Sequence, residues 1–417
     1  MKNSRTLALA FILIPLFSIS QSRNISSYSE NANMAVMFAM RSPYDTIIFD
    51  KGASPWILGP MNIKNVRNKV VILEEGVEIK AKPGAFPKTG HALFQFIECT
   101  DITILGNGGL IRMNKEEYTD GEWRHGISLR GCKNFTIRDL TVRDTGGDGV
   151  YLDGWGKDIP YSENITIKGV HSINNKRQGL SIISAKTVLI SDCLFAETKG
   201  TNPAAGLDIE PDHPDNQIVD IRINHCTFRD NYGTGIKLAL AQLNSDSNPI
   251  SVLVENCVIT NNHSEDNPKS AAELLIHSNS YSPVKGEVVF RKCVIENSKW
   301  GVFYSRKRAD SFSVTFIDCS AKNICSAGTW PPFFLEVPDY YKKTGEVGGF
   351  FFKNFYLSYK TEVPLLVVQG SRIGTLEGLK DIGGDITISG NDNEFFRFVN
   401  YDPKLNNNVN LDITRKY

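Results

Sequence analysis

The chain has 417 residues, and its 46 Lys and Arg balance its 46 Asp and Glu, so the formal net charge is zero. A balanced and evenly mixed charge gives no bulk attraction to nucleic acid or to an anionic membrane, and we expect neither partner. The length exceeds what one compact core usually organises. A solenoid avoids that limit, because it grows by adding rungs to a core of constant width.

Residues 1–20 have the features of a secretory signal. Lys2 and an apolar run over 7–17 precede Ser18-Ile19-Ser20, a small-x-small pattern that suits cleavage. The apolar run is shorter than a typical membrane span, and no later segment is apolar enough to form one. We therefore expect a secreted or periplasmic protein in which residues 21–417 form a single domain.

The mature chain begins with a polar stretch that becomes helix-like over Met34–Met40. A short amphipathic helix there would cap the open end of a solenoid. Strand patterns begin with Asp45–Phe49, and alternation of apolar and polar residues is regular from about 91 to 320. From Gly328 onward the pattern predicts irregular final rungs.

One short phrase recurs through the middle of the chain. It reads glycine, apolar, any, apolar, any, and its copies begin at Gly126, Gly149, Gly179, Gly206, Gly235 and Gly301. A repeat of this period predicts a solenoid. Because no helix pattern separates the copies, the sequence predicts an all-β fold, a parallel β-helix.

Eight cysteines in an exported chain would normally suggest disulfides. Five of them occupy one place in the repeat, which Leu140 and Val170 fill in earlier rungs: Cys193, Cys226, Cys257, Cys293 and Cys319. A place shared by Leu, Val and Cys indicates an interior column, where Cys acts as a small hydrophobic residue. Cys99 and Cys132 form a second column with Ala185. We expect free thiols and no metal site made of cysteines.

The coil pattern, the helix before it and the export signal resemble secreted carbohydrate-active enzymes with right-handed parallel β-helices. That group includes pectate lyases and polygalacturonase-like glycoside hydrolases. The stretches that carry the resemblance are Glu122–Gly126, Gly146–Gly149, Arg177–Gly179 and Ala205–Pro211. The chain departs from polygalacturonases at Gly147-Asp148-Gly149, which has one Asp where that family has two. The resemblance implies a polysaccharide or oligosaccharide substrate, including an anionic one. We expect the protein to be a monomer.

Charged residues occupy the outward positions of the phrase. Asp208 and Glu210 lie two apart on one predicted strand, so both should face one groove about 6.6–7 Å from each other. Asp153 should lie two rungs away and Asp148 at the groove edge. These four are the predicted catalytic carboxylates. The predicted substrate contacts are Arg177, Lys237, His125, Arg130, Trp155 and Tyr151.

This arrangement favours a glycoside hydrolase that needs no cofactor. One protonated carboxyl would donate to the leaving oxygen and one carboxylate would activate water, a pair that inverting enzymes hold about 6.5–9.5 Å apart. Crowding of acids would raise one pKa, as a general acid requires. Arg177 and Lys237 would position the substrate.

Two alternatives remain open at this stage. In a polysaccharide lyase, Asp153, Asp208 and Glu210 would bind Ca²⁺, and Lys237 or Arg177 would remove the proton next to a uronate. In a non-catalytic glycan-binding β-helix, the groove would carry aromatic and polar residues without clustered acids. Hydrolysis is favoured over elimination because it requires only the carboxyl groups, whereas elimination also requires Ca²⁺ and a basic side chain.

Overall fold

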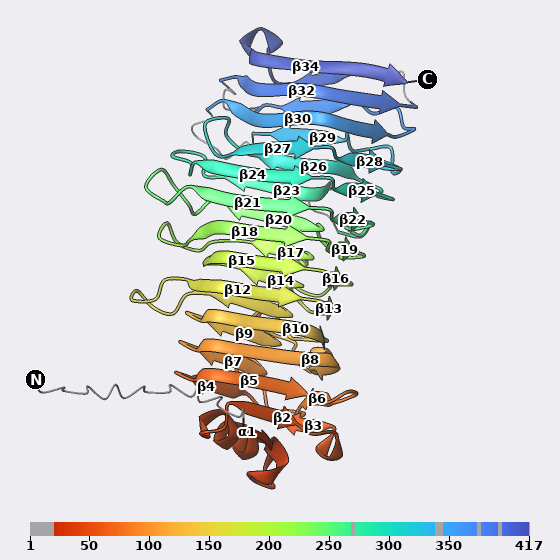
Figure 1. Cartoon of the computed structure of the whole chain (residues 1–417). Helices are drawn as coiled ribbons and strands as arrows, with labels where there is room; N and C mark the ends of the chain where they lie inside the picture. The colour runs from red at the N-terminus through yellow and green to blue at the C-terminus, as the bar shows by residue number, and fades with distance from the viewer. Residues whose placement is uncertain (1–20, 268–271, 338–344, 373–376, 391–393, 417) are drawn as a thin grey trace, which may run out of the picture.

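The computed structural model describes residues 21–267, 272–337, 345–372, 377–390 and 394–416, so the predicted signal at 1–20 lies outside the described residues. In these residues the strands form two sheets, one of 12 strands and one of 22. Figure 1 shows them stacked as successive rungs from the α1 end to β34. The predicted all-β solenoid is confirmed as a parallel β-helix, since every strand pairs in parallel with its counterpart one rung away.

The 12-stranded sheet is built from the glycine phrases and carries the candidate site. Its strands are β4 (Met61–Lys64), β7 (Phe94–Ile97), β9 (Ile127–Arg130), β11 (Val150–Asp153), β14 (Leu180–Ile182), β17 (Leu207–Ile209), β20 (Ile236–Leu240), β23 (Ala272–Ser278), β26 (Gly301–Arg306), β29 (Phe333–Glu336), β31 (Leu366–Gln369) and β33 (Phe396–Val399).

The 22-stranded sheet covers the other two sides of the coil. One series of its strands, of 3 to 13 residues each, is β1 (Ser22–Asn24), β2 (Thr46–Phe49), β5 (Arg67–Leu73), β8 (Thr100–Arg112), β10 (Lys133–Arg143), β12 (Ser162–Lys168), β15 (Ala185–Ser191), β18 (Ile218–Asn224), β21 (Ile250–Glu255), β24 (Gly286–Arg291), β27 (Ser313–Ile317), β30 (Val347–Ser358), β32 (Leu379–Ser389) and β34 (Asn407–Lys416). Its short strands are β3 (Trp56–Leu58), β6 (Glu78–Ala81), β13 (His171–Ile173), β16 (Leu194–Ala196), β19 (Thr227–Arg229), β22 (Val258–Thr260), β25 (Val294–Glu296) and β28 (Ser320–Lys322).

The predicted cap helix is α1 (Ala32–Arg41), which closes the N-terminal end of the coil in Figure 1. Asn31 caps it by accepting a hydrogen bond from the Met34 amide, and Val36 and Met40 are buried against the first rungs. The strands begin earlier than predicted, because β1 already pairs with β2. Short 3₁₀ turns occupy Ile25–Ser27, Lys51–Ala53, Lys115–Glu117 and Pro403–Leu405. No helix in the described ranges is long and apolar enough to cross a membrane.

The glycine phrases stack as predicted, with one exception. Leu207 lies level with Leu180 and Ile236, and all three are buried. The copy at Gly301 is shifted by one residue, because Phe303 rather than Val302 falls in that apolar column. In the strand between, Glu273 fills the place of the glycine and accepts hydrogen bonds from Asn262 in the preceding turn. The Glu273 side chain bonds to Asn262 in the turn, where the other copies have a glycine. The glycine of the phrase therefore does not mark how β20, β23 and β26 pair.

The cysteine columns lie inside the coil. Cys193 is level with Val170 and Cys226, and the column continues through the next three rungs. In the second column, Ser162 lies between Cys132 and Ala185. The eight described cysteines are all buried and free.

Because these thiols are buried and unpaired, we expect them to be unreactive in the native protein and reactive after unfolding. Thiol titration in denaturant without reductant should detect all eight, whereas titration of folded protein should detect almost none. Paired half-cystines in the denatured sample would contradict the interior columns.

Candidate active site on the 12-stranded sheet

The outer face of the 12-stranded sheet carries two columns of side chains. The first runs through Ser128, Tyr151, Ser181, Asp208 and Lys237. The second runs through Arg130, Asp153, Ile183 and Glu210. The phrase thus places the predicted residues on one face, as the sequence indicated. Asp153 and Glu210 share a column two rungs apart, a backbone distance of about 10 Å.

Lys237 joins the two carboxylates of β17. Its ammonium lies 3.1 Å from Asp208 Oδ2 and 2.8 Å from Glu210 Oε1. The sequence predicted that this pair would leave a gap for water and substrate. The ammonium fills that gap instead, so Asp208 and Glu210 are not a free pair across a scissile bond.

The two carboxylates differ in exposure. Asp208 is 0% exposed, and it accepts a hydrogen bond of 2.7 Å from Gln178 Nε2. The Glu210 side chain is 29% exposed. Asp208 was expected to point into the groove, but neighbouring side chains cover it, so it lies beneath the groove floor. Glu210 is the member of the pair that a substrate can reach.

The surroundings push the pKa values of these groups apart. Burial raises the pKa of Asp208 to about 7, although the charge of Lys237 opposes that rise. Burial also acts on Glu210, but the charges of Lys237 and Arg177 outweigh it and lower the pKa of that carboxyl. Burial disfavours charge on Lys237 too, yet its two carboxylate partners raise its pKa. At neutral pH, Glu210 and Lys237 are therefore both charged.

Arg177 lies in the turn before β14 and connects three carboxylates. Its guanidinium is 2.8 Å from Glu210, 3.2 Å from Glu122 and 3.6 Å from Asp148. The side chain is mostly buried, and although burial opposes its charge, these carboxylates raise its pKa. Arg177 thus holds Glu210 in place. Because its guanidinium already pairs with three carboxylates, Arg177 is less available to bind an anionic substrate than the sequence suggested.

A buried layer supports the floor on the β9 and β11 side. Asp148 and His125 are 0% and 2% exposed, and the Asp148 amide donates to His125 Nδ1 at 3.1 Å. The His125 ring stacks on Tyr151 at 4.4 Å. Burial lowers the pKa of His125 well below its usual value, so the ring is neutral. The predicted groove roles of Asp148, His125 and Tyr151 are therefore corrected to supporting positions under the surface.

Asp148 makes stability depend on pH. Burial raises its pKa to about 7, whereas an unfolded Asp titrates near pH 4. A raised pKa means that the folded state prefers the protonated form, so this stabilisation is complete below about pH 4 and is lost as the pH rises through about 7. Asp148→Asn mimics the neutral acid. We expect it to raise the melting temperature by about 2 °C or more at pH 8 and by less at pH 4. An equal change at both pH values would contradict a titrating buried carboxyl.

A cavity of about 620 Å³ opens beside Arg130 and Asp153. Its walls are the loop Gly154–Pro160 and the segment His213–Asn216. An antiparallel bridge between Trp155 and Ile159 holds the first loop in place. Trp155 lines this cavity, as expected for a residue that contacts sugar. These two loops thus wall the outer face of the sheet beside Asp153.

Asp153 faces this cavity with its side chain 19% exposed. Its Oδ2 accepts a hydrogen bond from Tyr151 at 3.1 Å and lies 3.7 Å from Arg130 Nη1. Burial raises the pKa of Asp153 even though Arg130 opposes the rise, and the nearby charge of Asp212 adds to it. Asp153 therefore holds its proton to a higher pH than an ordinary aspartate.

Three contributing residues were missed by the sequence reasoning. Gln178 directly precedes the glycine of its phrase, as Asp148 does. This shared position in the repeat could have identified Gln178 from the sequence. Glu122 lies in a long loop, where spacing predicts nothing about contacts. Asp212 follows the stretch Ala205–Pro211, where the phrase has ended; it is exposed and its charge raises the pKa of Asp153.

The acids predicted to bind Ca²⁺ do not form a cation site. Asp208 and Glu210 both face Lys237, and Asp153 is two rungs away. In the part of the chain that the structure describes, no group of three His, Cys, Asp or Glu side chains is placed to hold a metal ion. The donor set of the lyase alternative does not fit the ion.

The fold is shared with enzymes that act on polysaccharides. The A-module of mannuronan C-5 epimerase AlgE6 from Azotobacter vinelandii matches with a TM-score of 0.56 and 12% identity, covering 94% of this chain and 99% of that one. A family 28 exopolygalacturonase from Yersinia enterocolitica matches with a TM-score of 0.51 and 12% identity, covering 95% and 79%. At these identities the likeness shows the fold alone.

A sequence relative is the uncharacterized protein YclG of Bacillus subtilis (strain 168), which is 29% identical over 227 residues. The match covers 47% of this chain and 38% of YclG, so the chain spans well under half the length of that relative. A family model described as a right handed beta helix region matches residues 100–266 and 159–331, more than half of the chain, and the chain belongs to this right-handed β-helix family.

Proposed function

We propose that the protein is a secreted polysaccharide hydrolase whose active site lies on the outer face of the 12-stranded sheet. Structural neighbours that act on polysaccharides support a carbohydrate substrate. The observation that carries the reaction is the pair Asp153 and Glu210, which share one column and have pKa values shifted in opposite directions. Such a pair supplies one group to donate a proton and one to accept it.

In this mechanism Asp153 is the general acid. Its raised pKa keeps a proton available for the leaving glycosidic oxygen, and it faces the cavity walled by the Trp155 loop. Glu210, two rungs from Asp153, is the general base. Its ion pairs with Arg177 and Lys237 keep its carboxylate ionised and fixed in position. The backbones of the two residues are about 10 Å apart, slightly more than the 6.5–9.5 Å between the carboxyl groups of inverting enzymes, which must admit a water between them.

The same geometry argues against elimination with Lys237 as the base. A catalytic lysine needs a lowered pKa to be neutral at working pH. The carboxylates of Asp208 and Glu210 raise the pKa of Lys237, even though burial opposes them, and they occupy its ammonium. Arg177 is likewise held in its charged form. In the hydrolase these two cations position Glu210.

A screen of neutral and uronate polysaccharides tests this function. New reducing ends should appear without the ultraviolet absorbance of an unsaturated sugar, and a chelator should not change the rate. The Glu210→Gln variant serves as the negative control. Activity that is lost with EDTA, restored by Ca²⁺ and accompanied by an unsaturated product would instead establish a lyase.

A further inference from the structure

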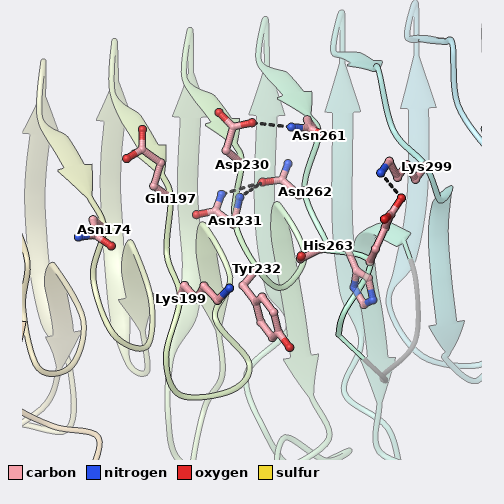
Figure 2. Close-up of a pocket in the computed structure, with 12 residues that line it drawn as sticks. Asn174, Glu197, Lys199, Asp230, Asn231, Tyr232, Asn261, Asn262, His263 and Lys299 are labelled. Atoms are coloured by element: carbon pink, nitrogen blue, oxygen red, sulfur yellow. Dashed lines mark hydrogen bonds and ion pairs between the residues drawn. The ribbon is translucent and has the colours of Figure 1, made fainter. Parts of the chain in front are cut away.

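A second cavity, of about 450 Å³, lies outside the candidate active site. It runs over the turns between the short strands and the 12-stranded sheet, from Asn174 after β13 to Lys299 after β25 (Figure 2). Residues from five successive rungs line it, and at about 4.8 Å per rung it extends roughly 19 Å along the coil. That length suits an extended chain better than a compact small molecule.

One wall of this turn groove repeats with the rungs. Asn174, Glu197, Asp230 and Asn261 follow four consecutive short strands, and each has a positive φ between 51° and 60°. The same backbone conformation in each turn sets these side chains in a row, and Asn261 Nδ2 donates to Asp230 Oδ1 at 2.7 Å. A row of amides and carboxylates offers donors and acceptors at a regular spacing, which suits a ligand with repeated hydroxyl groups.

Tyr232 and Lys199 provide the other contact surface. Figure 2 shows them together, apart from Glu197 and Asp230. The Tyr232 hydroxyl donates to the Asp266 carbonyl at 3.1 Å, which fixes the ring. The Lys199 ammonium lies 5.1 Å from the ring centroid on a side chain that is 64% exposed, so it is accessible to the hydroxyl groups of a ligand on the ring. A fixed aromatic ring beside hydrogen-bonding groups has the apolar and polar character that amphipathic ligands require.

The charges of the turn groove are already balanced. Glu265 pairs with Lys299. Arg229 pairs with both Glu197 and Asp230. These ion pairs leave no surplus of either sign to attract a charged polymer.

We propose that the turn groove binds a neutral oligosaccharide segment of a glycan without cleaving it. Ring stacking on Tyr232 and hydrogen bonds to the opposite wall would hold the ligand along the coil. This inference goes beyond the proposed hydrolysis and does not depend on it, because binding here requires no chemistry on the 12-stranded sheet.

Affinity electrophoresis tests the inference on the full-length protein. Native gels would contain xyloglucan, mixed-linkage β-glucan or galactomannan as neutral probes, and polygalacturonate or alginate as anionic probes. At least one neutral probe should retard the wild-type protein, and Tyr232→Ala should weaken that binding at least about fivefold, the usual effect of removing an aromatic anchor. Lys199→Ala, at a highly exposed position, should weaken it without any effect on folding.

A matched control is available two rungs beyond the groove, on the same side of the coil. Tyr356 on β30 also lies beneath a lysine, with Lys322 at 5.8 Å from its ring, but on the 22-stranded sheet away from the groove. Tyr356→Ala should bind as the wild type does. The inference is overturned if no neutral probe retards the wild type, or if retardation persists in both groove variants. Loss of binding with polysaccharide cleavage intact would separate this site from the active site.

Discussion

Glu210→Gln is expected to lower kcat at least about 10²-fold on any polysaccharide that the wild type cleaves. Glutamine keeps the shape of the side chain but cannot accept the proton of the attacking water. Asp153→Asn should cause a loss of the same order, because it removes the proposed proton donor. Initial rates from reducing-end assays measure both effects.

The pH dependence separates the two roles. The pKa of Glu210 is lowered and that of Asp153 is raised, so the wild type should be active between these two values. Glu210→Gln should remove the decline in kcat/KM on the acid side, and Asp153→Asn the decline on the alkaline side. Glu163→Gln, on the 22-stranded sheet, is the matched control and should behave as the wild type. Near-wild-type kcat in Glu210→Gln would show that the base lies elsewhere.

Lys237→Met is expected to lower the free energy of unfolding by about 3 kcal/mol, the low end for removing one partner of a buried ion pair. The ammonium is mostly buried between Asp208 and Glu210, and without it the fully buried Asp208 loses its nearest cation. Urea unfolding at neutral pH measures the change. The double variant Lys237→Met with Asp208→Asn should recover part of the loss, because it removes the unpaired charge.

The control for this effect is Lys133→Met. Lys133 pairs with Glu163 at 2.8 Å, but both side chains are well exposed. Exposed pairs contribute about 0–1 kcal/mol, so this variant should unfold almost as the wild type does. If Lys237→Met were equally mild, the ion pairs beneath the groove would not stabilise the fold as described.

The sequence predicts the coil well because its signal is periodic. The columns of Cys193 and of Leu207 need only the repeat and the alternation of inward and outward residues. The pattern fails in two successive rungs, where Glu273 takes the place of the glycine and Gly301 then lies level with Ala272, one residue early. A local substitution of this kind leaves no periodic trace, so it cannot be inferred from spacing.

The site is predicted less completely for a different reason. Alternation establishes that Asp208 and Glu210 point outward, but it does not show what covers them. Burial of Asp208 depends on Gln178 and Lys237, which come from the two adjacent rungs. Exposure of Asp153 to a cavity depends on loops whose conformation the repeat does not specify. The direction of a side chain is thus a property of its own strand, whereas its accessibility is a property of its neighbours.

Mass spectrometry of the cleavage products tests the central claim most directly. If Asp153 and Glu210 hydrolyse a glycosidic bond, each cleavage adds one water to the summed mass of the fragments. In heavy-oxygen water, promptly quenched products should carry one heavy oxygen per cleaved bond, and Glu210→Gln should give almost no product. Fragments without the added water, with an unsaturated end and no incorporated heavy oxygen, would contradict hydrolysis and establish elimination on this sheet.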